Sequence, residues 1–543
     1  MSGRRFAPAL FPLVVVLAAT GCGPGEEAGL GEVELVEATE PGTEPVDRVV
    51  WGLPQGEPRT LDPVRAGSPS ESAVAVNLCE SLLRLHPDYS IGPGVAAYAE
   101  WEDEDTFAIG IEEGVTFWDG TPVTAEDVAY GLERQMDPQV QAVTAFAFAG
   151  VEEVRTDGPL RVVLEMEGPD IQFRNLLAGA AGAVVQKEYA EEAGEAFGRA
   201  DGGLMCTGPF AFGEWRHGEG LTITANDAYR DGAPLVDELE FRFVNDSSTV
   251  TAALISGEMD GAYQPPVEGS RTLRSSDAGT LYAGPSTMSA SFGPTTDEGP
   301  AADPRVRRAL DLAIDKDLYV EQVLRGMGRP MKTFTPPLAW EGDPAADIYR
   351  QGYDALPEIG GPDLEQARAL VEEAGAGGAE LVLAIASGDQ ESLLGAQIVQ
   401  AAGADIGLDI SIERFQPTEF AAFFYDPAAR EGTDLVATTG YLEAPGALYY
   451  APMFALEGGD FNWSGHDDPE VAGALRGAMA TTDPEEAAEG FVEAQRLYHD
   501  ARLQVTLGET YSRLFLRDGL TGPPVSSAWL AAPWAARLGG TGE

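Results

Sequence analysis

Residues 114–128 read GVTFWDGTPVTAEDV and combine a tight turn with the start of a helix. Asp119-Gly120 suits the turn, because glycine accepts a positive φ without a Cβ clash. Thr124, followed three residues later by Asp127, is a capping pattern typical of a helix N-terminus. These residues therefore predict a structural corner that leads into a helix, and we do not expect them to contact a ligand.

Outward from this corner, the hydrophobic pattern predicts a mixed α/β chain. Strand-like runs and helical spacings alternate, and the run 381–385, helix 393–402 and run 408–412 together suggest a βαβ unit. Aspartate followed by proline opens three further helices. The remaining predicted elements are strands at 48–53, 107–111 and 160–166, a helix at 71–85, and helices that begin after Asp303, Asp468 and Asp483.

Length and charge bound the possible functions. The chain has 543 residues, enough for two or more packed lobes. It contains 34 Lys and Arg against 89 Asp and Glu, which gives a formal net charge of −55. Such a surface repels phosphate backbones, so nucleic acid is excluded as a partner.

The first residues have the three parts of an export signal. Residues 1–22 carry Arg4 and Arg5, then an apolar stretch, then Thr-Gly-Cys ending at Cys22. The segment is similar to bacterial lipoprotein signals, which implies cleavage and lipidation at Cys22; an ordinary secretory signal is the alternative. Residues 23–47 are rich in Gly, Pro and Glu, and we expect a flexible acidic tether there.

The remaining cysteines and the histidines leave few sites for special chemistry. Outside the cytoplasm, Cys79 and Cys206 either form a disulfide or remain as two buried thiols, and the sequence leaves both readings open. The four histidines are scattered, and no Cys or His pair has the spacing of metal ligands. We therefore predict no metal site and no cofactor.

Catalytic signatures are absent from the sequence. It has no G-x-S-x-G elbow, no H-E-x-x-H, no P-loop and no G-x-G-x-x-G after a strand. Acidic pairs such as those at 100–105 arise by chance in so acidic a chain. We therefore expect no enzyme and predict no catalytic residue.

Several segments occur in a familiar order. Together with residues 114–128, they closely resemble the extracellular solute-binding proteins of ABC importers in the oligopeptide, dipeptide and nickel class, family 5. The resemblance covers about residues 48–522. Its other segments are 49–63, 77–83, 92–99, 207–210, 226–230, 252–260, 303–317 and 462–470. The chain departs from the family at Cys206, where glycine is usual, and at Arg230, where tryptophan is usual.

The resemblance implies an α/β fold of two lobes, like that of periplasmic binding proteins, joined by a double hinge. Lobe I would comprise residues 48–285, with an extra subdomain at about 85–203, and lobe II residues 286–505. Residues 506–543 would return to lobe I and form the tail. The chain would cross between lobes near 281–289 and again near 503–510.

The same resemblance implies a function without chemistry. A peptide or similar small polar solute would bind between the lobes, and hinge closure would present it to the membrane permease. The protein would be a monomer outside the cytoplasm, held to the cell membrane by lipid. The alternatives are a lipoprotein that senses solute without transport and an extracytoplasmic hydrolase that uses acidic residues.

Segment correspondence also implies the residues that line the binding cleft. Glu443 is the only acid in 441–445, the nearest counterpart of the family segment that places an aspartate against a peptide's amino group. Each candidate also has a structural reading: a loop hydroxyl for the first serine, and core packing for the methionine, the tryptophan and the tyrosine. The candidates are Ser68, Met288, Ser289, Trp340, Tyr441 and Glu443.

Overall fold

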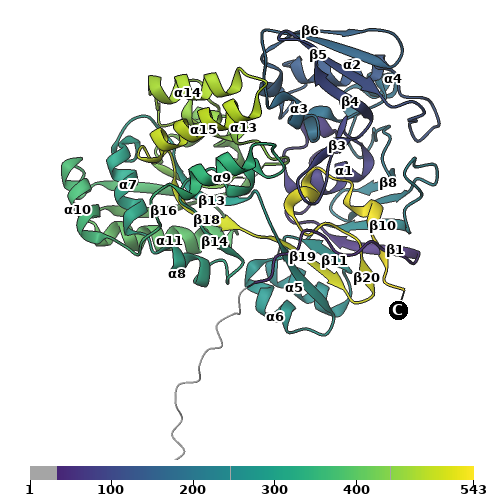
Figure 1. Ribbon diagram of the computed structural model, residues 1–543. Helices are drawn as coiled ribbons and strands as arrows, with labels where there is room; N and C mark the ends of the chain where they lie inside the picture. Colours follow the sequence, from purple (N-terminus) through teal and green to yellow (C-terminus); the bar gives the residue numbers. More distant parts are fainter. Residues whose placement is uncertain (1–32, 245, 441, 543) are drawn as a thin grey trace, which may run out of the picture.

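The computed structural model describes residues 33–244, 246–440 and 442–542. Two α/β lobes lie side by side, and a subdomain sits on the first lobe next to helices of the second (Figure 1). The lobes are built on a seven-stranded and a six-stranded sheet, and the subdomain is built on a four-stranded sheet. This arrangement confirms the two-lobed α/β fold.

Lobe I is organised around strand β1 (Val46–Gly52), at the centre of its sheet. Val49 and Trp51 alternate onto one face of β1 and are fully buried, which explains why this apolar run forms a strand. β1 pairs parallel with β10 and β11. In the order of the sheet, the strands are β12 (Gly279–Gly284), β19 (Ser512–Arg517), β11 (Gly261–Tyr263), β1, β10 (Val236–Arg242), β9 (Gly220–Ala225) and β8 (Phe210–Arg216).

The C-terminal segment completes the core of lobe I. Trp529 stacks on Tyr263 with ring centroids 4.4 Å apart, and Trp534 lies 4.3 Å from Trp51. Both tryptophans of the segment are fully or almost fully buried. Lobe I therefore depends on residues from both ends of the chain.

The subdomain contains the corner formed by residues 114–128. Gly120 has a φ of +83°, and its N–H donates to the carbonyl of Phe117, as the Asp-Gly pair predicts. The carboxylate of Asp127 accepts from the N–H and the hydroxyl of Thr124, 3.0 and 2.7 Å away, at the start of α2 (Ala125–Met136). The subdomain sheet, in order, is β4 (Ala96–Trp101), β5 (Thr106–Ile111), β7 (Arg161–Met166) and β6 (Val151–Thr156).

Lobe II contains the predicted βαβ unit. β15 (Glu380–Ala386) and β16 (Asp409–Phe415) pair in parallel, and α11 (Gln390–Asp405) connects them. Aspartates cap α7 (Pro304–Ala313), α14 (Pro469–Met479) and α15 (Pro484–His499), as the Asp-Pro pairs predict. The sheet, in order, is β14 (Gly328–Pro330), β18 (Val505–Thr510), β13 (Ser289–Pro294), β17 (Leu435–Gly440), β15 and β16.

The remaining elements surround these sheets. The helices are α3 (Phe173–Leu176), α4 (Lys187–Ala193), α5 (Ser247–Ser256), α6 (Ser270–Arg274), α8 (Lys316–Gln322), α9 (Ala346–Asp354), α10 (Leu364–Glu373), α12 (Pro417–Ala422) and α13 (Ala447–Ala455). Two short ladders pair β2 (Leu83–Leu85) with β3 (Ile91–Pro93) and β20 (Leu520–Thr521) with β21 (Gly539–Gly540).

The helix predicted at 71–85 is too long. α1 (Pro69–Leu78) ends before Cys79, and the chain continues in extended form to β2 (Leu83–Leu85). Leu78 packs in the lobe I core, whereas Leu82 packs in the subdomain core. Backbone pairing with residues 177–184 replaces the helical hydrogen bonds, so tertiary contacts overrode the helical spacing.

The chain passes between the lobes twice. Residues 285–288 lead from β12 in lobe I to β13 in lobe II, and Tyr511 alone separates β18 in lobe II from β19 in lobe I. The predicted end of lobe II at 505 therefore falls too early, because the whole of β18 pairs with β13 and β14. Both strands at this crossing are almost completely buried, although they carry polar residues such as Glu509, Ser512 and Arg513, so the sequence does not mark the return as an exposed segment.

The tether prediction is wrong for residues 33–47. Leu35 forms a bridge with Ala283, and the N–H and hydroxyl of Thr39 both donate to the carbonyl of Pro523. β1 already begins at Val46. Backbone hydrogen bonds to lobe I hold this segment in place, although its composition predicts a flexible segment. The predicted signal 1–22, the Cys22 lipidation site and tether residues 23–32 lie outside the described residues.

Candidate functional site between the lobes

The loop after β17 brings lobe II against lobe I. The carbonyl of Leu442 accepts from the hydroxyl of Thr287 at 2.7 Å, and Ala444 packs in the core of the subdomain. A second contact joins the subdomain to the end of α14, where the Ile171 N–H donates to the carbonyl of Met479 at 3.3 Å. The two lobes therefore touch across their junction in this structure.

Glu443 lies at the centre of this contact. One carboxylate oxygen accepts from the Ala180 N–H at 3.2 Å, and the other accepts from the Ser72 hydroxyl at 3.4 Å. Both partners belong to lobe I and its subdomain, and neither is charged. Burial raises the pKa of Glu443 to about 7, and the two hydrogen bonds offset only part of that rise. Glu443 is therefore partly protonated at neutral pH.

A small cavity beside Glu443 has a volume of about 20 Å³, room for little more than one water molecule. Ser72, Ala180 and Leu530 are among its lining residues. With the lobes in contact, Glu443 therefore faces lobe I directly and no space of solute size.

A larger cavity, with a volume of about 210 Å³, is lined by residues 445–447 of the same segment. Lobe II contributes one wall, where Trp340 stacks on Tyr349 with ring planes 3° apart. Lobe I and its subdomain contribute the other wall. The lining residues are Tyr89, Ile91, Gln172, Arg174 and Asn175 from lobe I, and 339–344, Tyr349 and 445–447 from lobe II.

The larger cavity has polar groups at both walls. Gln172 is 5% exposed, and its buried side-chain oxygen has no hydrogen-bond partner in the described structure. Burial lowers the pKa of the Arg174 guanidinium, while the charge of Glu100 opposes that shift. On the opposite wall, burial raises the pKa of Asp343, although the Ala345 N–H donates to its carboxylate. A solute between these walls could satisfy groups from both lobes.

Two of the predicted cleft residues have structural roles, and a third is buried in a strand. Ser68 caps α1: its hydroxyl accepts from the Glu71 N–H, and the Glu71 carboxylate accepts from the Ser68 N–H. Met288 is buried in the lobe I core, where its sulfur accepts from Gln264. Ser289 is 1% exposed at the start of β13. None of the three lines either cavity.

The other predicted residues lie at the junction or outside the description. Trp340 lines the larger cavity, and Glu443 lines the smaller one. Tyr441 is outside the described residues. The sequence reasoning missed Gln172, Arg174 and Asp343, because nothing local distinguishes these residues from other surface polar residues. Only the fold reveals that they face a cavity.

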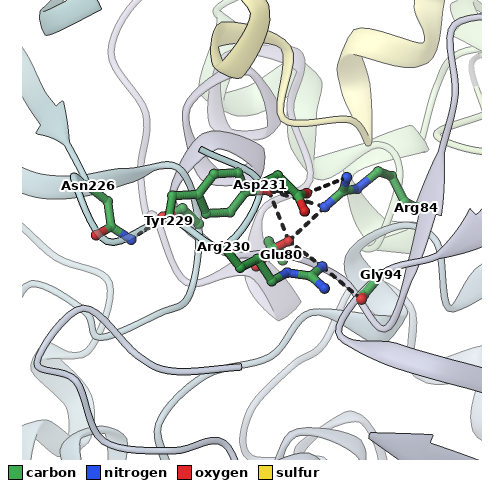
Figure 2. Close-up of polar contacts among 8 residues, drawn as sticks. Glu80, Arg84, Gly94, Asn226, Tyr229, Arg230 and Asp231 are labelled. Atoms are coloured by element: carbon green, nitrogen blue, oxygen red, sulfur yellow. Dashed lines mark hydrogen bonds and ion pairs between the residues drawn. The ribbon is translucent and has the colours of Figure 1, made fainter. Parts of the chain in front are cut away.

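Cys79 and Cys206 form a disulfide with Cα atoms 4.9 Å apart. Of the two alternatives that the sequence left open, a disulfide or two free thiols, the structure has the disulfide. Next to it, Figure 2 shows Glu80 at the centre of a polar network. Its carboxylate accepts from Arg84 at 3.0 Å, Arg230 at 2.9 Å and Tyr229 at 3.1 Å. Cys206 and Arg230, two departures from the family pattern, thus both form cross-links within lobe I and its subdomain.

Membrane spans and metal clusters were sought among the same described residues. No helix there is both long and apolar enough to cross a membrane. No group of three or more His, Cys, Asp or Glu side chains in that part of the chain could hold a metal ion.

Comparison with known proteins finds relatives that are solute-binding proteins. Residues 90–462 match the family model described as bacterial extracellular solute-binding proteins, family 5 middle. The glutathione-binding protein GsiB of Salmonella typhimurium is 27% identical over 444 residues, which cover 80% of this chain and 84% of that protein.

Two solved structures share the fold. The binding protein AgaA from A. tumefaciens R10, in complex with agropinic acid, has a TM-score of 0.79 and 23% identity, covering 91% of this chain and 99% of AgaA. DppA from Helicobacter pylori, in complex with the peptide STSA, has a TM-score of 0.78 and 20% identity, covering 92% of this chain and 98% of DppA.

Proposed function

Because the chain belongs to family 5 of the bacterial extracellular solute-binding proteins, and so serves as the solute receptor of an ABC importer, we propose that it captures a short peptide or similar small polar solute between its lobes. Hinge closure then presents the bound solute to the permease subunits.

The observation that carries this proposal is the larger cavity, because both lobes line it. A solute that contacts both walls binds the closed form more tightly than the open form, and only such differential affinity shifts the equilibrium toward closure. The stacked Trp340 and Tyr349 offer an apolar surface, while Gln172 and Arg174 offer polar contacts.

Size and the relatives favour a small peptide as the solute. The cavity of about 210 Å³ is smaller than typical sites for drug-sized ligands, which begin at about 300 Å³. The relative GsiB is named as a glutathione-binding protein, and DppA was solved with the peptide STSA. We therefore expect a solute of two or three residues, with glutathione as the first compound to try.

The remaining parts of the proposal concern the oligomeric state of the protein, its location and the fate of its solute. We propose that the mature chain acts as a monomer outside the cytoplasm, that lipid on Cys22 holds it to the cell membrane, and that it releases its solute unchanged. The signal-like residues 1–22 and the lack of catalytic signatures in the sequence support these parts.

Native mass spectrometry of the protein lacking residues 1–22, followed by identification of whatever it releases on denaturation, tests the proposal. We expect a small peptide or another small polar solute. The released compound should compact the emptied protein in X-ray scattering.

A pair of glycine variants tests the position of the site. A Cβ at Gly446 would lie 3.0 Å from the Gln172 side-chain oxygen, so Gly446→Leu should obstruct the cavity and weaken binding. Gly473→Leu is the matched control, because its Cβ would meet open space. A protein that releases nothing and keeps its shape with every peptide and small-solute pool would contradict the proposal.

A further inference from the structure

Two groups on the lobe I wall of the larger cavity lack a hydrogen-bond partner among the described residues. The buried oxygen of Gln172 accepts no hydrogen bond, and the Arg174 guanidinium forms no hydrogen bond or ion pair with any residue that the structure describes, the charge of Glu100 acting on it only from farther away. Gln172 is more than nine-tenths buried, and leaving such an oxygen unpaired is costly. The two side chains lie two positions apart, at the start of α3.

The lack of a partner for Arg174 is notable in this chain. Acidic residues outnumber basic ones by 89 to 34, so a carboxylate partner is easy to supply. Glu80, deep in lobe I, has ion pairs with both Arg84 and Arg230. Arg174 is partly buried, lines a cavity, and keeps its hydrogen-bond donors for a group that the protein does not provide.

The chemistry of these two groups defines a complementary ligand. The oxygen of Gln172 requires an N–H donor, and a guanidinium binds a carboxylate through two parallel hydrogen bonds. An N-substituted α-amino acid carries an N–H and a carboxylate on the same carbon atom. The carboxyl-terminal residue of a peptide is such a group.

We propose that Gln172 and Arg174 form a subsite for the carboxyl-terminal residue of a short peptide: Gln172 accepts from its amide N–H, and Arg174 binds its carboxylate. The rest of the peptide extends toward Trp340 and Asp343 on lobe II. This inference rests on the proposed function and moves the principal recognition from Glu443, whose oxygens lobe I already satisfies, to the subdomain.

Titration calorimetry with matched ligands tests the subsite. A pool of di- and tripeptides, including glutathione, is screened first, and the best binder is compared with its own carboxyl-terminal amide. Wild-type protein should bind the free acid about 10- to 100-fold more tightly, because hydrogen bonds between charged groups contribute about 1.5–3 kcal/mol.

Arg174→Gln should bind the acid and the amide with equal affinity, at the level of the wild type with the amide. Arg174→Lys should recover part of the preference, since it keeps the charge and loses the paired geometry. Arg155→Gln is the matched control, because Arg155 lies in the same subdomain and pairs with Glu165 away from the cavity. Gln172→Met should weaken binding of both ligands alike.

The outcomes separate the two proposals. If the acid binds Arg174→Gln as tightly as wild type, or if no peptide of the pool binds, the subsite is overturned. A natural solute that lacks a carboxylate next to an N–H also overturns the subsite but leaves the proposed function standing. A protein that binds no solute of any kind contradicts both.

Discussion

Two buried carboxylates, Asp311 inside lobe II and Glu443 at the junction of the lobes, have pKa values shifted in opposite directions. In lobe II, Lys316 and Arg502 lie 2.8 and 2.9 Å from the carboxylate of Asp311, whose side chain is 8% exposed. Burial by itself would raise the pKa of Asp311, but these two cations hold it below its ordinary value. At the junction, Glu443 has only neutral donors, and its pKa is raised to about 7.

The difference follows from where the partners of each carboxylate lie. Asp311 and its two cations all belong to lobe II, so the cations offset its lost solvation whether or not the lobes touch. Glu443 is desolvated only when the lobes meet, and a permanent cation beside it would favour the closed form without solute. We therefore expect Glu443 to respond when the lobes separate, and Asp311 to be unaffected.

Removing the carboxylate of Asp311 inside lobe II should decrease the stability of the protein more than any other change proposed below. Asp311→Ala leaves Lys316 and Arg502 buried without their counter-charge, so we expect a loss of about 3–5 kcal/mol in the free energy of unfolding. Urea denaturation followed by circular dichroism measures it, with the exposed Asp317→Ala as the control. Because the pKa of Asp311 is lowered, its contribution is present above pH 3.8 and lost as the pH falls below. A loss under about 1 kcal/mol would contradict permanent pairing inside the lobe.

The disulfide tests the rigidity of lobe I. Cys79 and Cys206 are 127 residues apart in sequence, so replacing both with alanine should cost about 2–4 kcal/mol of stability. The bond lies within lobe I, so solute should still compact the variant in X-ray scattering. Wild type under reducing conditions controls for the alanine substitutions. Loss of closure with unchanged stability would show that the bond belongs to the junction and would break the comparison.

Acidity should favour closure without solute. The pKa of Glu443 is raised on closure, so the closed form is most stable below the ordinary value of 4.5 and loses stability as the pH rises through about 7. The loss is at most about 3 kcal/mol, because one pKa unit corresponds to about 1.4 kcal/mol and Glu443 keeps some exposure.

X-ray scattering across pH 5–8 checks this expectation. The ligand-free wild type should expand as the pH rises, and Glu443→Gln should remain compact. Glu372→Gln, on the exposed side of α10, is the matched control and should behave like wild type. An identical pH response in Glu443→Gln would show that other groups govern closure.

An exposed pair should show the smallest effect. Glu493 and Arg496 lie 2.6 Å apart on the surface of α15, where water screens both charges. Glu493→Gln should leave the melting temperature unchanged within error, in differential scanning calorimetry. A clear decrease would mean that surface charge also matters in this acidic protein, and that burial does not explain the contrast between Asp311 and Glu443.

Local patterns predicted elements but not where they end. The Asp-Pro pairs located three helix starts, since a cap is formed by residues within one turn. The helix predicted from Glu71 ran on to Leu85, because the apolar spacing could not show that Leu78 and Leu82 enter different cores. The order of residues 33–47 was also missed, since their partners lie at the other end of the chain.

For the candidate site, the sequence predicted some of the residues that line the cavities but not the polar groups that face them. Trp340 and Glu443 do line the two cavities, whereas Ser68 caps a helix and Met288 fills a core. Gln172 and Arg174 carry no local signal, because an unpaired side chain is recognised only when all its neighbours are known.

The sequence by itself determined a mixed α/β chain, several helix starts and the acidic composition, since these depend on local periodicity and composition, and its resemblance to a known family implied the two lobes. Tertiary structure decided which charges are paired. Asp311 lies 191 residues from Arg502, and Glu443 lies 263 residues from the Ala180 N–H. Electrostatic and hydrogen-bonding energies depend on distances in space, and only the folded chain sets those distances.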